Sequence, residues 1–140
     1  VAGEFAHGTI PWLGNARALE KHVAPRITAA AKAAGRAEPR IVTGLPVAVH
    51  DDEDEARETI ERLFGAYNTM PNYQRLLAHG EAERVADVAI VGNEDTVVES
   101  IEAMFRAGAA DFWAAPVAVG DVKSASRARA RALLTELANS

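Results

Sequence analysis

The pattern of hydrophobic and polar positions divides the chain into alternating strands and helices, and the clearest strand runs from Ile41 to Val49. Nearly every position in it is apolar, and several are β-branched, which predicts a strand buried on both faces. At His50 the pattern changes to five consecutive acids, Asp51 to Glu55. Acids cap free backbone N–H groups and complement the positive end of a helix dipole. A helix is therefore predicted to begin here, and strand, turn and helix form half of a βαβ unit.

A shorter strand is predicted upstream, from Gly8 to Leu13. Because Pro11 cannot donate to a strand ladder, this segment is either an edge strand or a strand that bends at the proline. The helical spacing of apolar residues from Ala16 to Ala34 predicts a helix, and Gly35 follows it. Pro25 lies inside this helix, where it removes a backbone hydrogen bond, so we expect a kink or break near residues 22–24.

Downstream, the predicted elements alternate again. Apolar residues recur at helical spacing after the acidic turn and place Ile60, Leu63 and Phe64 toward the sheet. Residues 85–92 leave two alternatives open, a buried helical turn or an extended connector. Asn93 then caps a helix whose apolar stripe includes Phe105. The remaining predicted elements are helices at Asp52 to Tyr67 and Asn72 to Ala78, a strand at Asp111 to Ala115, and a helix at Ser124 to Ala138.

This order predicts an α/β fold with parallel strands and outer helices, since parallel neighbours need long right-handed crossovers. Three parallel strands would leave two unpaired edges, at residues 8–13 and 111–115, and oligomer contacts are expected at residues 8–13 or 111–117. Apolar side chains such as Val42 and Phe112 would also face water. We therefore expect the chain to associate with copies of itself as a homo-oligomer, with a two-fold dimer as the commonest arrangement.

Composition excludes several classes of function. The 140 residues include no cysteine, so disulfides, thiolate nucleophiles and cysteine-ligated metals are excluded, and a cytoplasmic location is expected. A net charge of −5 argues against a nucleic-acid partner. No apolar run approaches a membrane span, so no membrane partner is expected. The chain begins at Val1 without a methionine, which suggests a fragment of a longer protein.

Several segments together resemble the luciferase-like monooxygenase superfamily, in particular its deazaflavin-dependent oxidoreductases. They are HGTIPW at 7–12, HVAPRITAAAKAAGR at 22–36, PRIVTGLPVAVHDDEDEAR at 39–57 and DVAIVGNEDTVVESIEAMFRAGAADFWAAP at 87–116. The resemblance rests on the order and spacing of several weak motifs and covers nearly the whole chain. It implies that residues 1–140 form a single partial domain, the C-terminal portion, about three β/α units, of a TIM (β/α)8 barrel.

The resemblance also implies a cofactor, deazaflavin (coenzyme F-420, hereafter F420) or alternatively FMN, and a small-molecule substrate. It implies that the loop at Trp12, Leu13 and Gly14 approaches the cofactor or substrate, although Trp12 is equally well explained as a core aromatic. His50 ends the central strand and would lie at the barrel mouth, where active sites of this fold are found. Alternatively, His50 simply hydrogen-bonds the acidic helix start. Pro116, which closes the last strand, completes the group of binding residues.

Other charged groups are better explained as surface features. The acids at 51–55 lack the glycine turn that spaces ligands in a cation loop, so a capped helix start is preferred. Arg127, Arg129 and Arg131 alternate, so they are expected to spread over more than one helix face as surface side chains and not to form a single phosphate cradle. The remaining histidines show no zinc-binding spacing, and no metal is assigned.

Two hypotheses of function follow. In the first, the chain is an oxidoreductase, or part of one, that exchanges hydride between a deazaflavin or flavin and a small organic substrate. In the second, it is a non-catalytic half-barrel that self-associates through its sheet edges. Three strands are predicted where eight close a barrel, so the isolated chain is expected to be inactive.

Overall fold

A computed structural model describes all 140 residues, and its centre is a single long strand that is parallel to each of the other three. The strands are β1 (Gly8–Thr9), β2 (Arg40–Val49), β3 (Ile90–Gly92) and β4 (Asp111–Pro116). Strand β2 pairs with β1 at its beginning, with β4 over residues 42–47 and with β3 over residues 47–49. The predicted parallel α/β arrangement, with residues 41–49 at its centre, is confirmed.

The backbone hydrogen bonds of β2 place the other strands on its two sides. Gly44 N–H donates to the Pro11 carbonyl, and His50 N–H donates to the Gly92 carbonyl, so β1 and β3 share one side. The carbonyls of Ile41 and Val47 instead accept from the segment that contains β4. The outer edges of β1 and β4 have no strand beside them, as the sequence predicted.

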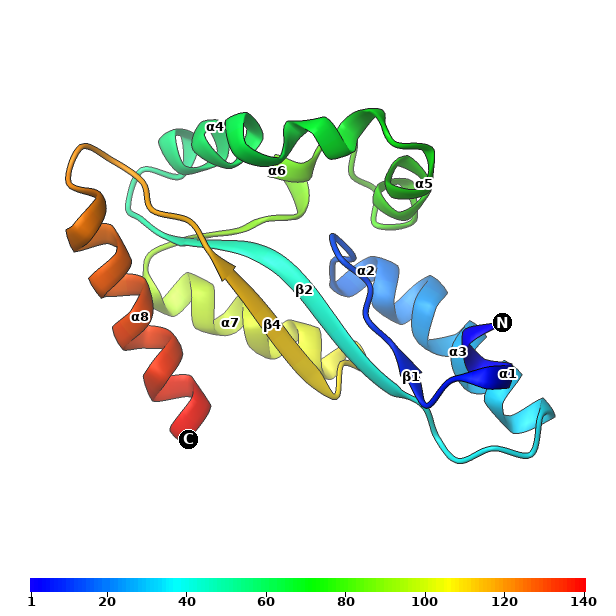
Figure 1. Ribbon diagram of the computed structural model, residues 1–140. Helices are drawn as coiled ribbons and strands as arrows, with labels where there is room; N and C mark the ends of the chain where they lie inside the picture. The colour runs from blue at the N-terminus through cyan, green and yellow to red at the C-terminus, as the bar shows by residue number, and fades with distance from the viewer.

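Eight α-helices and two irregular helical turns connect and flank these strands (Figure 1). They are α1 (Ala2–Phe5), α2 (Ala16–Ala18), the π-helical η1 (Leu19–Val23), α3 (Ala24–Ala33), α4 (Glu53–Phe64), the 3-10 turn η2 (Gly65–Thr69), α5 (Pro71–His79), α6 (Val85–Val88), α7 (Glu94–Arg106) and α8 (Lys123–Asn139).

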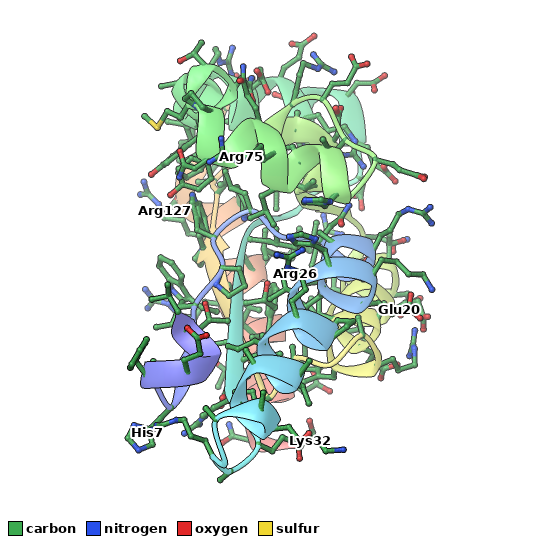
Figure 2. All side chains as sticks on the ribbon, turned by 90° about the vertical axis from the view of Figure 1, so that its right-hand side faces the viewer. His7, Glu20, Arg26, Lys32, Arg75 and Arg127 are labelled. Atoms are coloured by element: carbon green, nitrogen blue, oxygen red, sulfur yellow. The ribbon has the colours of Figure 1, made fainter.

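The sheet is covered by helices on one face, and the other face is open around Ile10 and Trp113 but buried at Pro46 and Ala48. Helix α7 lies behind β2 and β4 in Figure 1, and Figure 2 shows α2 and α3 on the same side of β2. The odd-numbered residues of β2 face these helices and form the core, at most 4% exposed. On the opposite face, Ile10 is 68% and Trp113 is 54% exposed. The open face of the sheet therefore carries large apolar side chains.

The register of β4 corrects one sequence-based assignment. Phe112 pairs with Thr43, which faces the helices, so Phe112 lies on the covered face and is half-buried. Trp113 pairs with Gly44 and lies on the open face instead. Val42 has the orientation expected for the open face and is half-buried.

The helix after β1 changes its winding at the predicted place. Residues 19–23 form a π-helical turn, and Pro25 follows within the first turn of α3. A π turn absorbs the hydrogen bond that proline cannot make, so the helix continues through the expected kink without breaking. Gly35 adopts a φ of 66° directly after the helix, where its lack of a Cβ permits the left-handed conformation.

Two predicted core residues are instead exposed to solvent. Ile60 on α4 is fully buried, as expected, but Leu63 is 61% exposed and Phe64 is half-buried. On α7, Phe105 is 47% exposed, whereas Val97 and Met104 are buried. Both exposed residues lie near a helix C-terminus.

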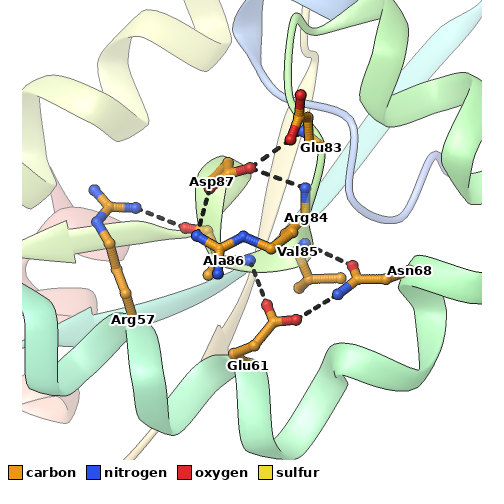
Figure 3. Close-up of polar contacts among 8 residues, drawn as sticks. All are labelled: Arg57, Glu61, Asn68, Glu83, Arg84, Val85, Ala86 and Asp87. Carbon is orange, nitrogen blue, oxygen red and sulfur yellow. Dashed lines mark hydrogen bonds and ion pairs between the residues drawn. The ribbon is translucent and has the colours of Figure 1, made fainter.

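The ambiguous residues 85–92 contain both alternatives in succession, the short helix α6 and then strand β3. A polar network fixes α6 against α4 (Figure 3). The Glu61 carboxylate accepts hydrogen bonds from the Ala86 N–H and from the side-chain amide of Asn68. The side-chain oxygen Oδ1 of Asn68 in turn accepts from the Val85 N–H at 2.9 Å. Arg57 donates to the Ala86 carbonyl at 2.6 Å. These bonds occupy the backbone groups of a helix too short to be stable alone, and β3 can then begin at Ile90.

No helix is both long and apolar enough to cross a bilayer.

Candidate functional site

An aromatic cluster at the end of β1 is the most distinctive feature of the open face. Trp12 follows Pro11 and forms an isolated parallel bridge with Gly44. Its ring centroid lies 5.2 Å from that of Trp113, 5.8 Å from that of Phe64 and 6.4 Å from that of Tyr67. Tyr73 extends the cluster through an edge-to-face contact with Tyr67 at 4.7 Å. Segments from β1, β4 and the α4 to α5 region therefore meet at one aromatic surface.

Gly44 explains why the two tryptophans can approach each other across β2. A Cβ at this position would lie 2.7 Å from the Trp113 ring and 3.0 Å from the Trp12 ring. Glycine leaves this space empty, so both indoles lie over the backbone of the central strand. The result is an apolar surface formed by Trp12, Gly44 and Trp113, with the two indole planes tilted by 40°, which we call the indole platform.

The Trp12 ring also carries an unused polar group. Its Nε1–H is shielded from solvent and has no hydrogen-bond partner. A buried donor without an acceptor is costly, so such groups often have a partner supplied by a ligand or water. The indole platform thus combines two tilted indole faces with one unpaired donor, which suits an aromatic ring system that carries carbonyl oxygens or ring nitrogens.

Leu13 and Gly14, predicted beside Trp12 in the binding loop, serve mainly to shape that loop. Leu13 is fully buried and has a φ of 68°, an uncommon conformation for a residue with a side chain. Its N–H donates to the Gly44 carbonyl at 2.9 Å. The Gly14 carbonyl accepts a hydrogen bond from the buried Thr43 hydroxyl at 3.1 Å. Both residues fix the turn that presents Trp12, and the Leu13 side chain has no surface to offer a ligand.

His50 lies at the carboxyl end of β2, as predicted. Its Nε2 is 2.7 Å from Glu55 Oε2, and its side chain is 22% exposed. Gly120, in the loop after β4, lies against the ring. The contact with Glu55 is the one expected if His50 bonds the acidic helix start. Six residues separate His50 from Gly44 along an extended strand, so His50 lies roughly 20 Å from the indole platform.

An ionic cluster beside His50 was not foreseen from the sequence. Arg129 on α8 donates to both carboxylate oxygens of Glu94, at 2.5 and 2.7 Å, and to Asp51 at 2.8 Å. These hydrogen bonds lower the pKa of Glu94 to about 2 and also lower the pKa of Asp51. Arg129 lies at the surface, as predicted, with its side chain 33% exposed, but the sequence did not predict that three sequence-distant segments meet at its guanidinium. No local pattern could have indicated this contact.

Pro116, the last predicted binding residue, is separate from Trp12. It ends β4 and lines a groove together with side chains of α8. The structure thus brings Trp12 together with Trp113, Phe64 and Tyr67, which the sequence reasoning had not assigned to a site. It places His50 and Pro116 elsewhere. No group of three or more histidine or acidic side chains is arranged to hold a metal ion.

The open parallel sheet with outer helices and an aromatic inner surface is the architecture of a segment of a (β/α)8 barrel. The sequence model of the luciferase-like monooxygenase family matches residues 1–111. The chain belongs to this family. No curated protein matches the chain.

Solved structures of the same family share the fold. An F420-dependent secondary alcohol dehydrogenase in complex with an F420-acetone adduct has a TM-score of 0.64 at 16% identity, over 82% of this chain and 38% of that one. The coenzyme F420-dependent tetrahydromethanopterin reductase of Methanopyrus kandleri has a TM-score of 0.62 at 24% identity, over 89% and 43%.

A third similar structure binds a flavin. It is the FMN complex of the oxygenating constituent of 3,6-diketocamphane monooxygenase, a type II Baeyer-Villiger monooxygenase from the CAM plasmid of Pseudomonas putida. Its TM-score is 0.51 at 22% identity, over 88% of this chain and 39% of that one. The chain spans about two fifths of the length of each of these three proteins. The predicted portion of a luciferase-like barrel is confirmed.

Proposed function

We propose that this chain forms one wall of the cofactor pocket of an oxidoreductase that uses F420, or alternatively FMN. The observation that carries the proposal is the indole platform, an aromatic surface of two tilted indoles on the open sheet face with a buried, unpartnered Nε1–H. In a (β/α)8 barrel this face lines the interior. The similar structures named above, two F420-dependent enzymes and one FMN complex, support the choice of cofactor.

The residues present fit the tricyclic part of such a cofactor. Trp12 and Trp113 provide apolar area for stacking, and Trp12 Nε1–H would donate to a ring acceptor. Phe64 and Tyr67 close one side of Trp12 and exclude water from it. When bound, the cofactor would supply hydride transfer to or from a small organic substrate. The role of this chain would be to position the ring and keep the site dry.

Titration with FMN and with F420, followed by ring absorbance and tryptophan fluorescence, tests the proposal. Trp113→Ala should weaken binding by about 1 kcal/mol or more because it removes half of the stacking surface. Phe105→Ala is the matched control, since Phe105 is a comparably exposed aromatic on α7, away from the platform. Failure of the unsubstituted chain to bind either cofactor, or equal losses for the two variants, would refute it.

A second candidate function is favoured by the exposure of Ile10 and Trp113. An apolar sheet face with two free edges is also what a self-associating half-barrel would present. In this alternative the same surface is covered by a second copy of the chain, and no cofactor is bound. The cofactor titration separates the two functions.

A further inference from the structure

A groove between the end of β4 and the exposed side of α8 lies outside the site described above. Its lining residues include Pro116, Arg127, Arg131, Leu134 and Thr135, and we call it the α8 groove. Pro116 and Leu134 supply its apolar part. Figure 2 shows Arg127 on the side of the sheet opposite α3. The groove is thus open to solvent beside the free edge of β4.

The charges of the α8 groove are unbalanced. Arg127 and Arg131 have no carboxylate within ion-pair distance, and neither makes a side-chain hydrogen bond, whereas Arg129 between them is held by Glu94 and Asp51. Side chains four residues apart on a helix are neighbours, so two unpaired cations there repel each other. No acidic residue lines the groove, although the chain carries 20 acids and a net charge of −5.

Arg127 and Arg131 therefore have the arrangement of an anion site. Each guanidinium offers several N–H donors in a planar fork that matches the oxygens of a phosphate. An anion between them would remove their mutual repulsion as well as accept their hydrogen bonds. The Thr135 hydroxyl, one turn further along the helix, is free to add a donor. Pro116 and Leu134 provide apolar contact for a carbon skeleton attached to the anion.

We propose that the α8 groove binds the phosphate group of a phosphorylated small molecule, with Arg127 and Arg131 as the ligands of the phosphate. The site is distinct from the indole platform, and the proposal does not depend on cofactor binding there. Its ligand is defined by chemistry, a dianionic phosphate monoester with a small apolar group.

An NMR titration of the ¹⁵N-labelled chain with phenyl phosphate tests this site, with phenol as the uncharged analogue and inorganic phosphate as the bare anion. Phenyl phosphate should shift the amides of residues 127–135 and bind about tenfold or more tightly than phenol, because only the former engages both guanidinium groups. Inorganic phosphate should shift the same amides at higher concentration. Raising the salt concentration should weaken both interactions.

The variant R127Q/R131Q should abolish these shifts while keeping the fold, since both side chains are exposed. The matched control is K32Q/R36Q, which removes the same charge from an unpaired pair at the same sequence spacing on and just beyond α3, with Lys32 exposed and Arg36 half-buried. It should bind phenyl phosphate like the unsubstituted chain. Equal weakening in both variants would show a non-specific charge effect and would overturn the proposal. Amide shifts that map outside the α8 groove would also overturn it, and so would equal affinities for phenyl phosphate and phenol.

Discussion

Arg129 and Glu94 join α8 to the first turn of α7 through two hydrogen bonds, 2.5 Å from Nε to Oε1 and 2.7 Å from Nη2 to Oε2. The same guanidinium reaches Asp51 in the turn after β2. Hydrogen bonding by Arg129 is the main cause that holds the pKa of Glu94 at about 2, below its ordinary value of 4.5. The turn after β2 and the first turn of α7 are thereby both joined to α8 through one side chain.

This contact predicts a dependence of stability on pH. Because the pKa of Glu94 is lower in the folded chain than in the unfolded chain, its contribution is complete above pH 4.5 and is lost as the pH falls toward 2. Arg129→Gln should therefore lower stability at pH 7 by roughly 1 kcal/mol or less, since the pair is partly exposed. The difference from the unsubstituted chain should vanish near pH 2. Urea unfolding at pH 7, 4 and 2.5 measures it.

Arg127→Gln is the control for Arg129→Gln. It removes the same charge from the same helix, but at a residue that has no ion-pair partner. Its effect on stability should be small and independent of pH between 7 and 2.5. A loss for Arg129→Gln that persists unchanged at pH 2.5 would show that the helix, and not the ion pair, accounts for it.

Gly44→Ala should disturb the indole platform. The added methyl group would lie 2.7 Å from the Trp113 ring, so one or both indoles must move. Overpacking of this kind costs about 1–3 kcal/mol. Tryptophan fluorescence should shift along with the melting temperature. Gly14→Ala is the control because its nearest new contact would be at 3.6 Å, an ordinary distance. Equal effects from the two substitutions would contradict the tight fit at Gly44.

Two neighbouring residues of α4 should respond very differently to truncation. Ile60 is fully buried, so Ile60→Ala should cost about 2–5 kcal/mol of unfolding free energy. Leu63 is 61% exposed, so Leu63→Ala should change stability by about 0.5 kcal/mol or less. Chemical unfolding of the two variants makes the comparison. Similar costs would mean that α4 is rotated about its axis relative to the orientation described above.

Under the second candidate function proposed above, we expect the isolated chain to associate with copies of itself through its open face and free edges. Trp113→Lys would place a charge on that face and should shift the chain toward monomer in light scattering at micromolar concentration. Leu63→Lys introduces the same charge at an exposed apolar position on α4 and should leave the association unchanged. A monomeric unsubstituted chain would contradict the proposal.

The fold could be predicted largely because its signals are local. The apolar run of β2 and the acidic turn after it indicate their structures through residues adjacent in sequence. Pro25 likewise marks the change of winding at η1, since the missing N–H belongs to the proline itself. Three of the four strands of the parallel sheet, β1, β2 and β4, follow from the same kind of pattern.

The candidate site could be predicted only in part, because its contacts join residues distant in sequence. Trp12 was identified, but its neighbour Trp113 lies 101 positions later and only the register of β4 places it there. Similarly, alternation of arginines on α8 gave no sign that Arg129 meets Glu94. Leu63 satisfies the helical period of its stripe, but periodicity does not tell which members of a stripe are covered.

The position of β2 between β1 and β4 has a consequence for how the chain acquires its structure. Val42 of β2 pairs with Asp111 of β4, which lies 69 residues later in the chain. The ribosome must therefore add 69 residues after Val42 before its partner exists. At ribosomal rates of about 5–20 residues per second, β2 waits for β4 for roughly 3 to 14 s. During this interval one side of the most apolar strand has no hydrogen-bonding neighbour, and pairings of such high contact order form slowly. We therefore expect the nascent chain to require chaperone protection until residue 116 has left the ribosome.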